Sequence, residues 1–169
     1  MRNDGEKMKK INKIFALILA VAMLCCALCA CGSETTKNVP AADITAAVAE
    51  KIGKTDAMSA ANDNWIKGYM KVDTASFGDY SVMVNAVGAN VDEFGVFKAG
   101  ENMSAKDIEA TVQAYLDLRL QSWMDEYMPE EKYKVEDAEY KVVGDYVMYC
   151  ILSAEDTETA FATIDGLLK

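Results

Sequence analysis

Carboxylates are the side chains in this chain best suited to chemistry, because the chain contains no histidine. Two carboxylates held a short distance apart across a cleft can cleave a glycosidic bond, one as the acid and the other as base or nucleophile. The dense carboxylate groups are Asp92-Glu93, Asp125-Glu126 and Glu130-Glu131. Each pair falls at the end of an expected element, and a small domain has little room for a catalytic cleft. We therefore expect solvated surface charges.

Other catalytic signatures are missing from the sequence. Without histidine, a cysteine–histidine pair and a histidine-containing zinc site are excluded. The chain has no glycine-rich phosphate loop, no GxSxG, no HExxH and no Asp-x-Asp-x-Asp-Gly calcium loop. We expect no cofactor, no metal and no catalytic residues. The alternative is a small carboxylate-dependent hydrolase or a metal-binding envelope protein.

Four of the five cysteines lie close together near the N-terminus, two at the end of the apolar run of residues 14–27 and two just after it, and four lysines precede that run. A basic segment followed by an apolar run of this length is typical of a secretory signal peptide, and the run is short for a membrane span. Leu28-Cys29-Ala30-Cys31 resembles the lipobox of bacterial lipoproteins, whose last cysteine receives a diacylglycerol. We expect a signal peptide over residues 1–30 and lipidation of Cys31. The protein would then be held on the extracytoplasmic face of the cell membrane.

The net charge of the chain limits the kinds of partner to expect, and the remaining charged and thiol groups are expected to be structural. The chain has 27 acidic and 17 basic residues, and without residues 1–30 it keeps 25 and 12, a net charge of about −13. Such a surface repels phosphates, so nucleic acid is not an expected partner. Arg119, the one arginine beyond residue 30, is expected to form a structural ion pair near Asp117 or with Glu126. Cys150 stands in the apolar stretch YVMYCIL and is expected to be a buried thiol.

The rest of the chain predicts one domain. Residues 31–39 would be the lipidated cysteine and a polar tether, and residues 40–169 a single α+β domain. A helix is expected from Pro40 to Gly53. Residues 54–79 show only one or two helical turns near Trp65. A hairpin (79–87 and 93–99), a helix over 104–128 ended by Pro129, a second hairpin (136–143 and 146–153) and a helix from about Asp156 follow.

The fold class expected is therefore α+β, with a four-stranded, mainly antiparallel sheet built from two hairpin-plus-helix units and an N-terminal helix. The strand over 146–153 is apolar on both faces, which favours a central position and the order 1-2-4-3 over 2-1-3-4. We expect the two long helices to share one face of the sheet. The N-terminal segment would cover the other face, with a ligand site in the groove between that segment and the sheet.

Several stretches together resemble one family. The lipobox, GANVDEFGVFKA, the helix with Arg119 and Gln121, YMPEE and GDYVMYCILSAED look like the short bacterial lipoproteins classed as domain of unknown function 4358. The resemblance spans Cys31 to the C-terminus. It implies a lipid-anchored extracytoplasmic α+β domain and implies no activity. We expect a non-enzymatic binding or interaction module for an unknown protein, peptide or small ligand.

Overall fold

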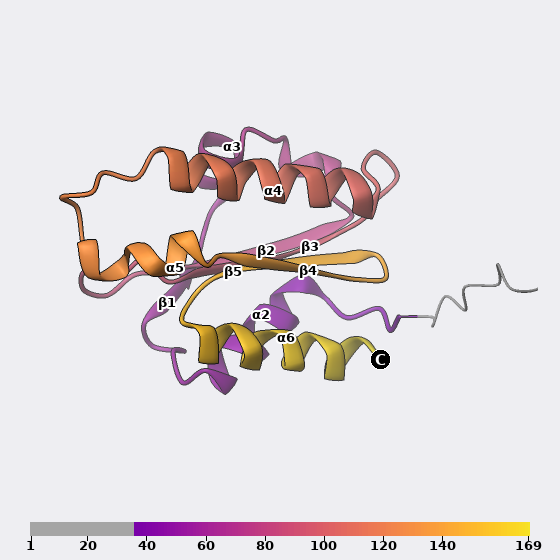
Figure 1. Ribbon diagram of the computed structural model, residues 1–169. Coiled ribbons are helices and arrows are strands. Elements are labelled where there is room, and N and C mark those ends of the chain that lie inside the picture. Colours follow the sequence, from indigo (N-terminus) through magenta and orange to yellow (C-terminus); the bar gives the residue numbers. More distant parts are fainter. Residues whose placement is uncertain (1–35) are drawn as a thin grey trace, which may run out of the picture. The chain divides into compact units, whose positions relative to one another are not determined.

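A computed structural model describes residues 36–169 of the chain (Figure 1). The predicted signal peptide and Cys31 lie outside the described residues. The elements are α2 (Ala41–Lys51), β1 (Met58–Ala60), α3 (Asp63–Met70), the 3-10 turn η1 (Thr74–Ser76), β2 (Asp79–Asn85), β3 (Glu93–Lys98), α4 (Ala105–Gln121), the 3-10 turn η2 (Pro129–Glu131), α5 (Lys132–Glu136), β4 (Glu139–Val143), β5 (Tyr146–Ile151) and α6 (Ala154–Leu168). Within this part of the chain, no helix has the length and apolar character needed to cross a membrane.

The sheet has five strands in the order β1-β2-β3-β5-β4, and every neighbouring pair is antiparallel. The four expected strands stand in the predicted order, with β5 between β3 and β4 and with β4 at an edge. The expectation of four strands is wrong by one, because Met58–Ala60 pairs with β2 as a fifth strand. Three residues are too few to show a strand period in the sequence.

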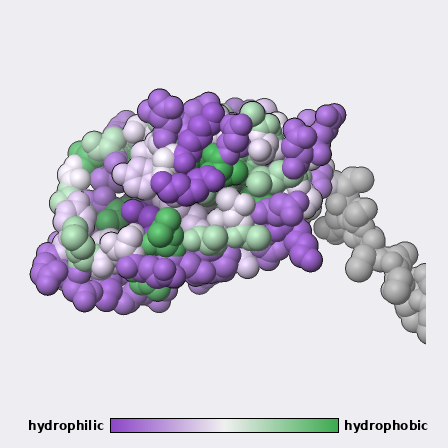
Figure 2. Space-filling model, turned by 90° about the horizontal axis from the view of Figure 1, so that it is seen from above, coloured by the Kyte–Doolittle hydropathy of each residue, from purple (hydrophilic) through white to green (hydrophobic). Residues whose placement is uncertain are grey.

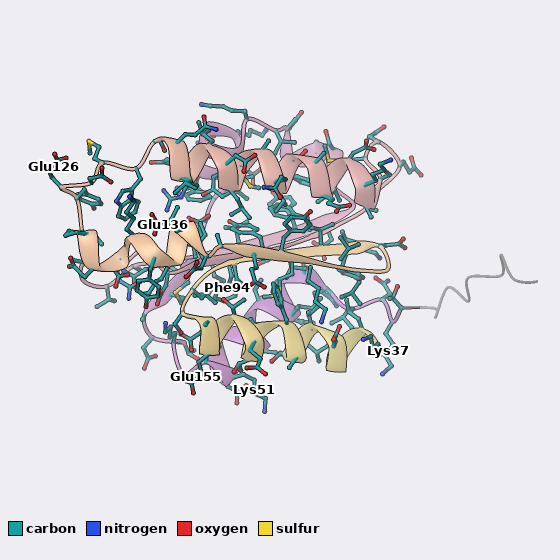
Figure 3. All side chains as sticks on the ribbon, viewed as in Figure 1. Lys37, Lys51, Phe94, Glu126, Glu136 and Glu155 are labelled. Atoms are coloured by element: carbon teal, nitrogen blue, oxygen red, sulfur yellow. The ribbon has the colours of Figure 1, made fainter. Side chains whose placement is uncertain are left out.

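Helices cover both faces of the sheet, as Figure 1 shows: α3 and α4 lie on one face, and α2 and α6 on the other. Phe94, labelled in Figure 3, lies in the layer between the sheet and α6. The prediction that the two long helices share a face is wrong. Both faces of β5 are fully apolar, and each is covered by a long helix: Val147, Tyr149 and Ile151 pack with the α4 core, and Tyr146, Met148 and Cys150 pack with the α6 core.

The N-terminal segment packs onto the domain, as predicted, but it divides between the two faces. Ile44 and Val48 of α2 are completely buried beside α6. Ile66 of α3 is completely buried on the opposite face, beside α4. Cys150 is also completely buried, which confirms the expected burial of its thiol.

The long helix α4 is shorter than predicted. Its start is confirmed, because Ser104 and Asp107 form a capping box. Its end is Gln121 rather than residue 128, since the buried stripe stops at Leu116 and Leu120 is 41 % exposed. A helix depends on packing of its apolar face, and beyond Leu116 that support falls away.

Candidate functional site

Asp92 and Glu93 are buried, with exposed fractions of 2 % and 3 %, so the expectation of a solvated pair is wrong here. Glu93 is the first residue of β3, which lies between β2 and β5 and is covered on both faces. Side chains alternate along a strand, so Glu93 lies in one row with Gly95 and Phe97, on the face covered by α4. The signal that could have predicted this burial is the central position of the strand, because both faces of a central strand are covered.

Glu93 is bonded to three side chains from β5 and α4. The hydroxyls of Tyr115 and Tyr149 both donate to its Oε1, at 2.5 Å and 2.6 Å. The Nη2 atom of Arg119 lies 3.4 Å from its Oε2. Arg119 therefore forms a structural ion pair, as expected, but with Glu93 rather than with Glu126 or a carboxylate near Asp117.

Burial dominates the electrostatics of this cluster. It raises the pKa of the Glu93 carboxyl, against the opposing influence of the Arg119 charge and the two tyrosine hydroxyls. Burial and the neighbouring carboxylate raise the pKa of Tyr115 and of Tyr149, so both remain hydrogen-bond donors. Burial alone would lower the pKa of Arg119, but the Glu93 charge and the neighbouring Tyr115, Tyr149 and Tyr69 together outweigh it, and the pKa is raised.

Gly95 makes room for this cluster. A Cβ atom at this position would lie 2.6 Å from Cε1 of Tyr149 and 2.9 Å from Cγ2 of Val82. Tyr149 is the cross-strand partner of Gly95, and its ring passes over the glycine to reach Glu93. The glycine therefore allows the tyrosine to bond the carboxylate.

A cleft of about 480 Å³ opens beside Glu93 and Arg119, and we call it the aromatic cleft. One wall is Trp65 and Tyr69 of α3, and the other is Trp123 and Tyr127 from the turns after α4. Further lining residues are Val84, Asn85, Asn90, Val91, Asp92, Ser122 and Met124. The expected place of a ligand site, between the N-terminal segment and the sheet, is close to this cleft, but the C-terminal end of α4 forms its second wall.

Two N–H donors that belong to residues lining the cleft have no hydrogen-bond acceptor among the described residues. They are Nε of Arg119 and Nε1 of Trp123, and both atoms are buried. Buried donors are nearly always bonded, and leaving one unbonded costs about 1–3 kcal/mol. Neither atom has accessible surface in this structure, so an acceptor from outside the chain would reach them only if neighbouring side chains moved.

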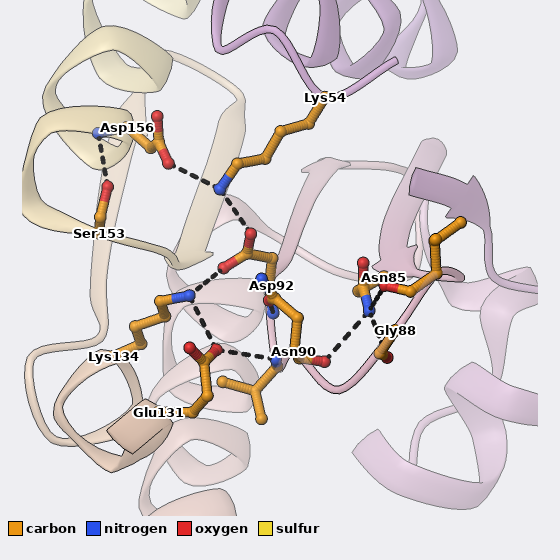
Figure 4. A network of polar contacts seen from close by, with 11 residues as sticks. Lys54, Asn85, Gly88, Asn90, Asp92, Glu131, Lys134, Ser153 and Asp156 are labelled. Atoms are coloured by element: carbon orange, nitrogen blue, oxygen red, sulfur yellow. Dashed lines mark hydrogen bonds and ion pairs between the residues drawn. The ribbon is translucent and has the colours of Figure 1, made fainter. Parts of the chain in front are cut away.

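Asp92 belongs to a network of five charged groups (Figure 4). Lys54 bridges Asp92 and Asp156, at 2.5 Å and 2.7 Å, and Lys134 bridges Asp92 and Glu131, both at 2.8 Å. Burial alone would raise the pKa of Asp92, but the hydrogen bonds from Lys134 and Lys54 outweigh it and the pKa is lowered. The network joins the loop after α2 and the start of α6 to α5.

The other two carboxylate pairs are mostly exposed to solvent, as expected. Asp125 and Glu126 are exposed, and Figure 3 shows Glu126 at the outer tip of the loop between α4 and α5. Glu130 is exposed as well. Glu131 is half-buried, because it accepts hydrogen bonds from Lys134 and from the backbone N–H of Val91.

A larger hollow, of about 770 Å³, lies between β4 and α6 and carries several carboxylates, among them Glu136, Glu139 and Glu158. They do not converge: among residues 36–169, no three acidic or cysteine side chains are placed to hold a metal ion. Asp165, at its margin, is paired with Lys141 at 2.6 Å. The aromatic cleft, with four aromatic side chains and a buried ion pair beside it, is therefore the candidate site.

Comparison with known proteins identifies the family. Searches of curated proteins and of solved structures find no match. A family model described as a domain of unknown function (DUF4358) matches residues 50–152, more than half of the chain. The matched range includes both walls of the aromatic cleft and four members of the Asp92 network. The chain belongs to the DUF4358 family.

Proposed function

We propose that this protein is a lipid-anchored, extracytoplasmic binding module whose ligand occupies the aromatic cleft. The observation that carries the proposal is an open hollow lined by four aromatic side chains, with the ion pair of Arg119 and Glu93 beside it. Concave sites with aromatic walls and a few placed polar groups are typical of small-molecule binding.

The anchor in this proposal is the lipid on Cys31, and it is supported by the lipobox and the apolar run before it. The backbone N–H of Lys37 already bonds to the carbonyl of Leu168, and that of Val39 bonds to the Tyr146 hydroxyl. An extended chain from Cys31 to Lys37 spans at most about 20 Å. A lipid on Cys31 would therefore keep the domain close to the membrane surface.

A non-enzymatic role fits the cleft better than hydrolysis does. Glycoside hydrolysis by the usual route needs two carboxyl groups that both face the substrate. The cleft offers Glu93, whose Oε1 already accepts two tyrosine hydroxyls. The Asp92 carboxylate is held by Lys54 and Lys134. The second carboxylate that hydrolysis requires is therefore engaged elsewhere.

The two tryptophans allow a direct test, because Trp65 and Trp123 are the only ones in the chain and both line the cleft. We would label the full-length protein with ¹⁵N, hold it in detergent micelles, and screen a small-fragment library for shifts of the two indole N–H signals. The proposal predicts that binding fragments move both signals, and that a Trp123→Phe variant binds them more weakly. If fragments bind but leave both indole signals unmoved, the cleft is not the ligand site.

A further inference from the structure

We propose that the ligand of the aromatic cleft is a neutral saccharide. This inference rests on the proposed function, since it names the chemical class that the same cleft would take. It follows from three features of the site: the exposed aromatic walls, the unbonded donors beside them, and the balanced charge of the floor.

The walls offer aromatic surface to a ring. Trp65 and Tyr69 have ring centroids 4.8 Å apart, and those of Trp123 and Tyr127 are 6.1 Å apart. Tyr69 is 51 % exposed and Tyr127 is 56 % exposed, so both walls reach solvent. The negative face of an aromatic ring attracts partly positive C–H groups, and a pyranose ring carries such groups on its faces.

Two lining residues carry donors that an oxygen acceptor could reach if neighbouring side chains move. Nε of Arg119 and Nε1 of Trp123 are buried without a partner among the described residues. Hydroxyl, ring and acetamido oxygens of a sugar can accept from such N–H groups, whereas a purely apolar ligand would leave both donors unsatisfied. A ligand that combines apolar ring faces with acceptor oxygens would suit both the walls and these donors.

The charge at the floor of the cleft, where Arg119 and Glu93 lie, favours a neutral ligand. Arg119 already faces Glu93, so the pair has no unbalanced charge to offer an anion or a cation. The chain as a whole carries a net charge of −10, which opposes the approach of an anionic ligand. Saccharides without carboxylate, phosphate or amino groups meet this condition.

The size of the cleft favours a small ligand over a peptide. Its volume of about 480 Å³ lies within the range of small-molecule sites. Proline-rich segments instead dock along extended aromatic grooves. Figure 2, which views the molecule from the α3 and α4 side, shows a mostly hydrophilic face whose hydrophobic areas are small and separate. A protein interface would show a larger apolar patch.

The test is a titration of the full-length protein in a polyoxyethylene detergent, whose head group is not a sugar. The probes are glucose, N-acetylglucosamine, maltose and cellobiose, each raised to about 50 mM, above the millimolar Kd of a weak small ligand. Glucuronate and a proline-rich decapeptide serve as comparison ligands. The readouts are tryptophan emission and the two indole N–H signals, which report on the cleft alone.

Three variants test whether a change in the tryptophan signals comes from binding in the aromatic cleft. Tyr69→Ala removes an exposed ring from one wall and should weaken binding at least about tenfold. Arg119→Lys keeps the positive charge but removes Nε, and it should weaken binding while the fold persists by circular dichroism. Tyr133→Ala is the matched control, because Tyr133 is 45 % exposed and lies outside the cleft. It should leave affinity unchanged.

The expected result is a saturable shift of both indole signals with at least one neutral saccharide, lost in Tyr69→Ala and retained in Tyr133→Ala. The inference is overturned if no saccharide moves either signal, or if glucuronate or the peptide binds more tightly. If fragments from the broader screen still move both tryptophans in that case, the cleft remains a binding site and only the ligand class is wrong. If neither sugars nor fragments move them, the proposed function fails as well.

Discussion

Replacing Asp92 with asparagine should strongly destabilise the fold, because the aspartate is the shared partner of two lysines. Its side chain is 2 % exposed, and that of Lys134 is 7 % exposed. Removing one member of a buried ion pair costs about 3–5 kcal/mol. Each lysine keeps one other carboxylate, since Lys134 bonds to Glu131 and Lys54 to Asp156. We therefore expect a loss near the lower end, about 3 kcal/mol, in urea unfolding followed by circular dichroism.

The matched control is Asp125→Asn, which removes an exposed carboxylate from Lys132. Lys132 retains Glu136, and this change should leave the urea midpoint where it was. If Asp92→Asn lowers the free energy of unfolding by less than about 1 kcal/mol, this reasoning is refuted, because the network would then contribute no more than exposed surface ion pairs do.

The effect of Asp92→Asn should also depend on pH, with a sign that follows from the pKa shifts. The pKa of Asp92 is lowered from 3.8 by its lysine hydrogen bonds, which outweigh burial, so its stabilisation is present above pH 3.8 and is lost as the pH falls further. The pKa of Lys134 is raised from 10.5 by Asp92 and Glu131 against burial, so its contribution is complete below pH 10.5 and is lost as the pH rises through the shifted value. The difference between wild type and variant should be largest between these limits.

Three further changes test other parts of the molecule. Cys31→Ala should remove the diacylglycerol mass and either release the protein from the detergent phase or leave it as unprocessed precursor; a wild-type protein without that mass would contradict lipidation. Cys150 is completely buried and burial raises the pKa of its thiol, so a thiol reagent should label it only as the fold opens, and rapid labelling of folded protein would contradict its burial. Gly95→Ala should lower the free energy of unfolding in urea by about 1–3 kcal/mol, because its new Cβ would clash with Tyr149. Gly166→Ala in α6, with no atom within 4 Å of the new Cβ, should be neutral or stabilising. Equal urea midpoints for the two variants would refute the steric explanation.

The pattern of β5 shows what the sequence could predict. Its residues are apolar on both faces, which predicts a central strand, and this strand together with the alternation in β4 leads to the observed order of four strands. The same pattern should have placed a long helix on each face. The expectation of a shared face was wrong because each of the two apolar rows of β5 needs its own long helix to cover it.

The candidate site was harder to predict, because it depends on tertiary position. Asp92-Glu93 looks like any other acidic pair until β3 is known to be covered on both faces, and the two adjacent residues bond to different partners. Arg119 lies 26 positions from Glu93 in the chain, and only the packing of α4 on the sheet brings them together. Trp65 and Trp123 come from segments whose boundaries local periodicity does not mark.

The entry of the chain and the aromatic cleft lie at opposite ends of the molecule. Lys37, where the described chain bonds to the end of α6, and Glu126, beside the cleft residues that follow α4, are at opposite ends of the view in Figure 3. The seventeen residues of α4 alone separate these ends by about 25 Å. A lipid on Cys31, as proposed above, would therefore attach the domain through the end where the chain enters and leave the end that carries the cleft without a covalent tie to the membrane.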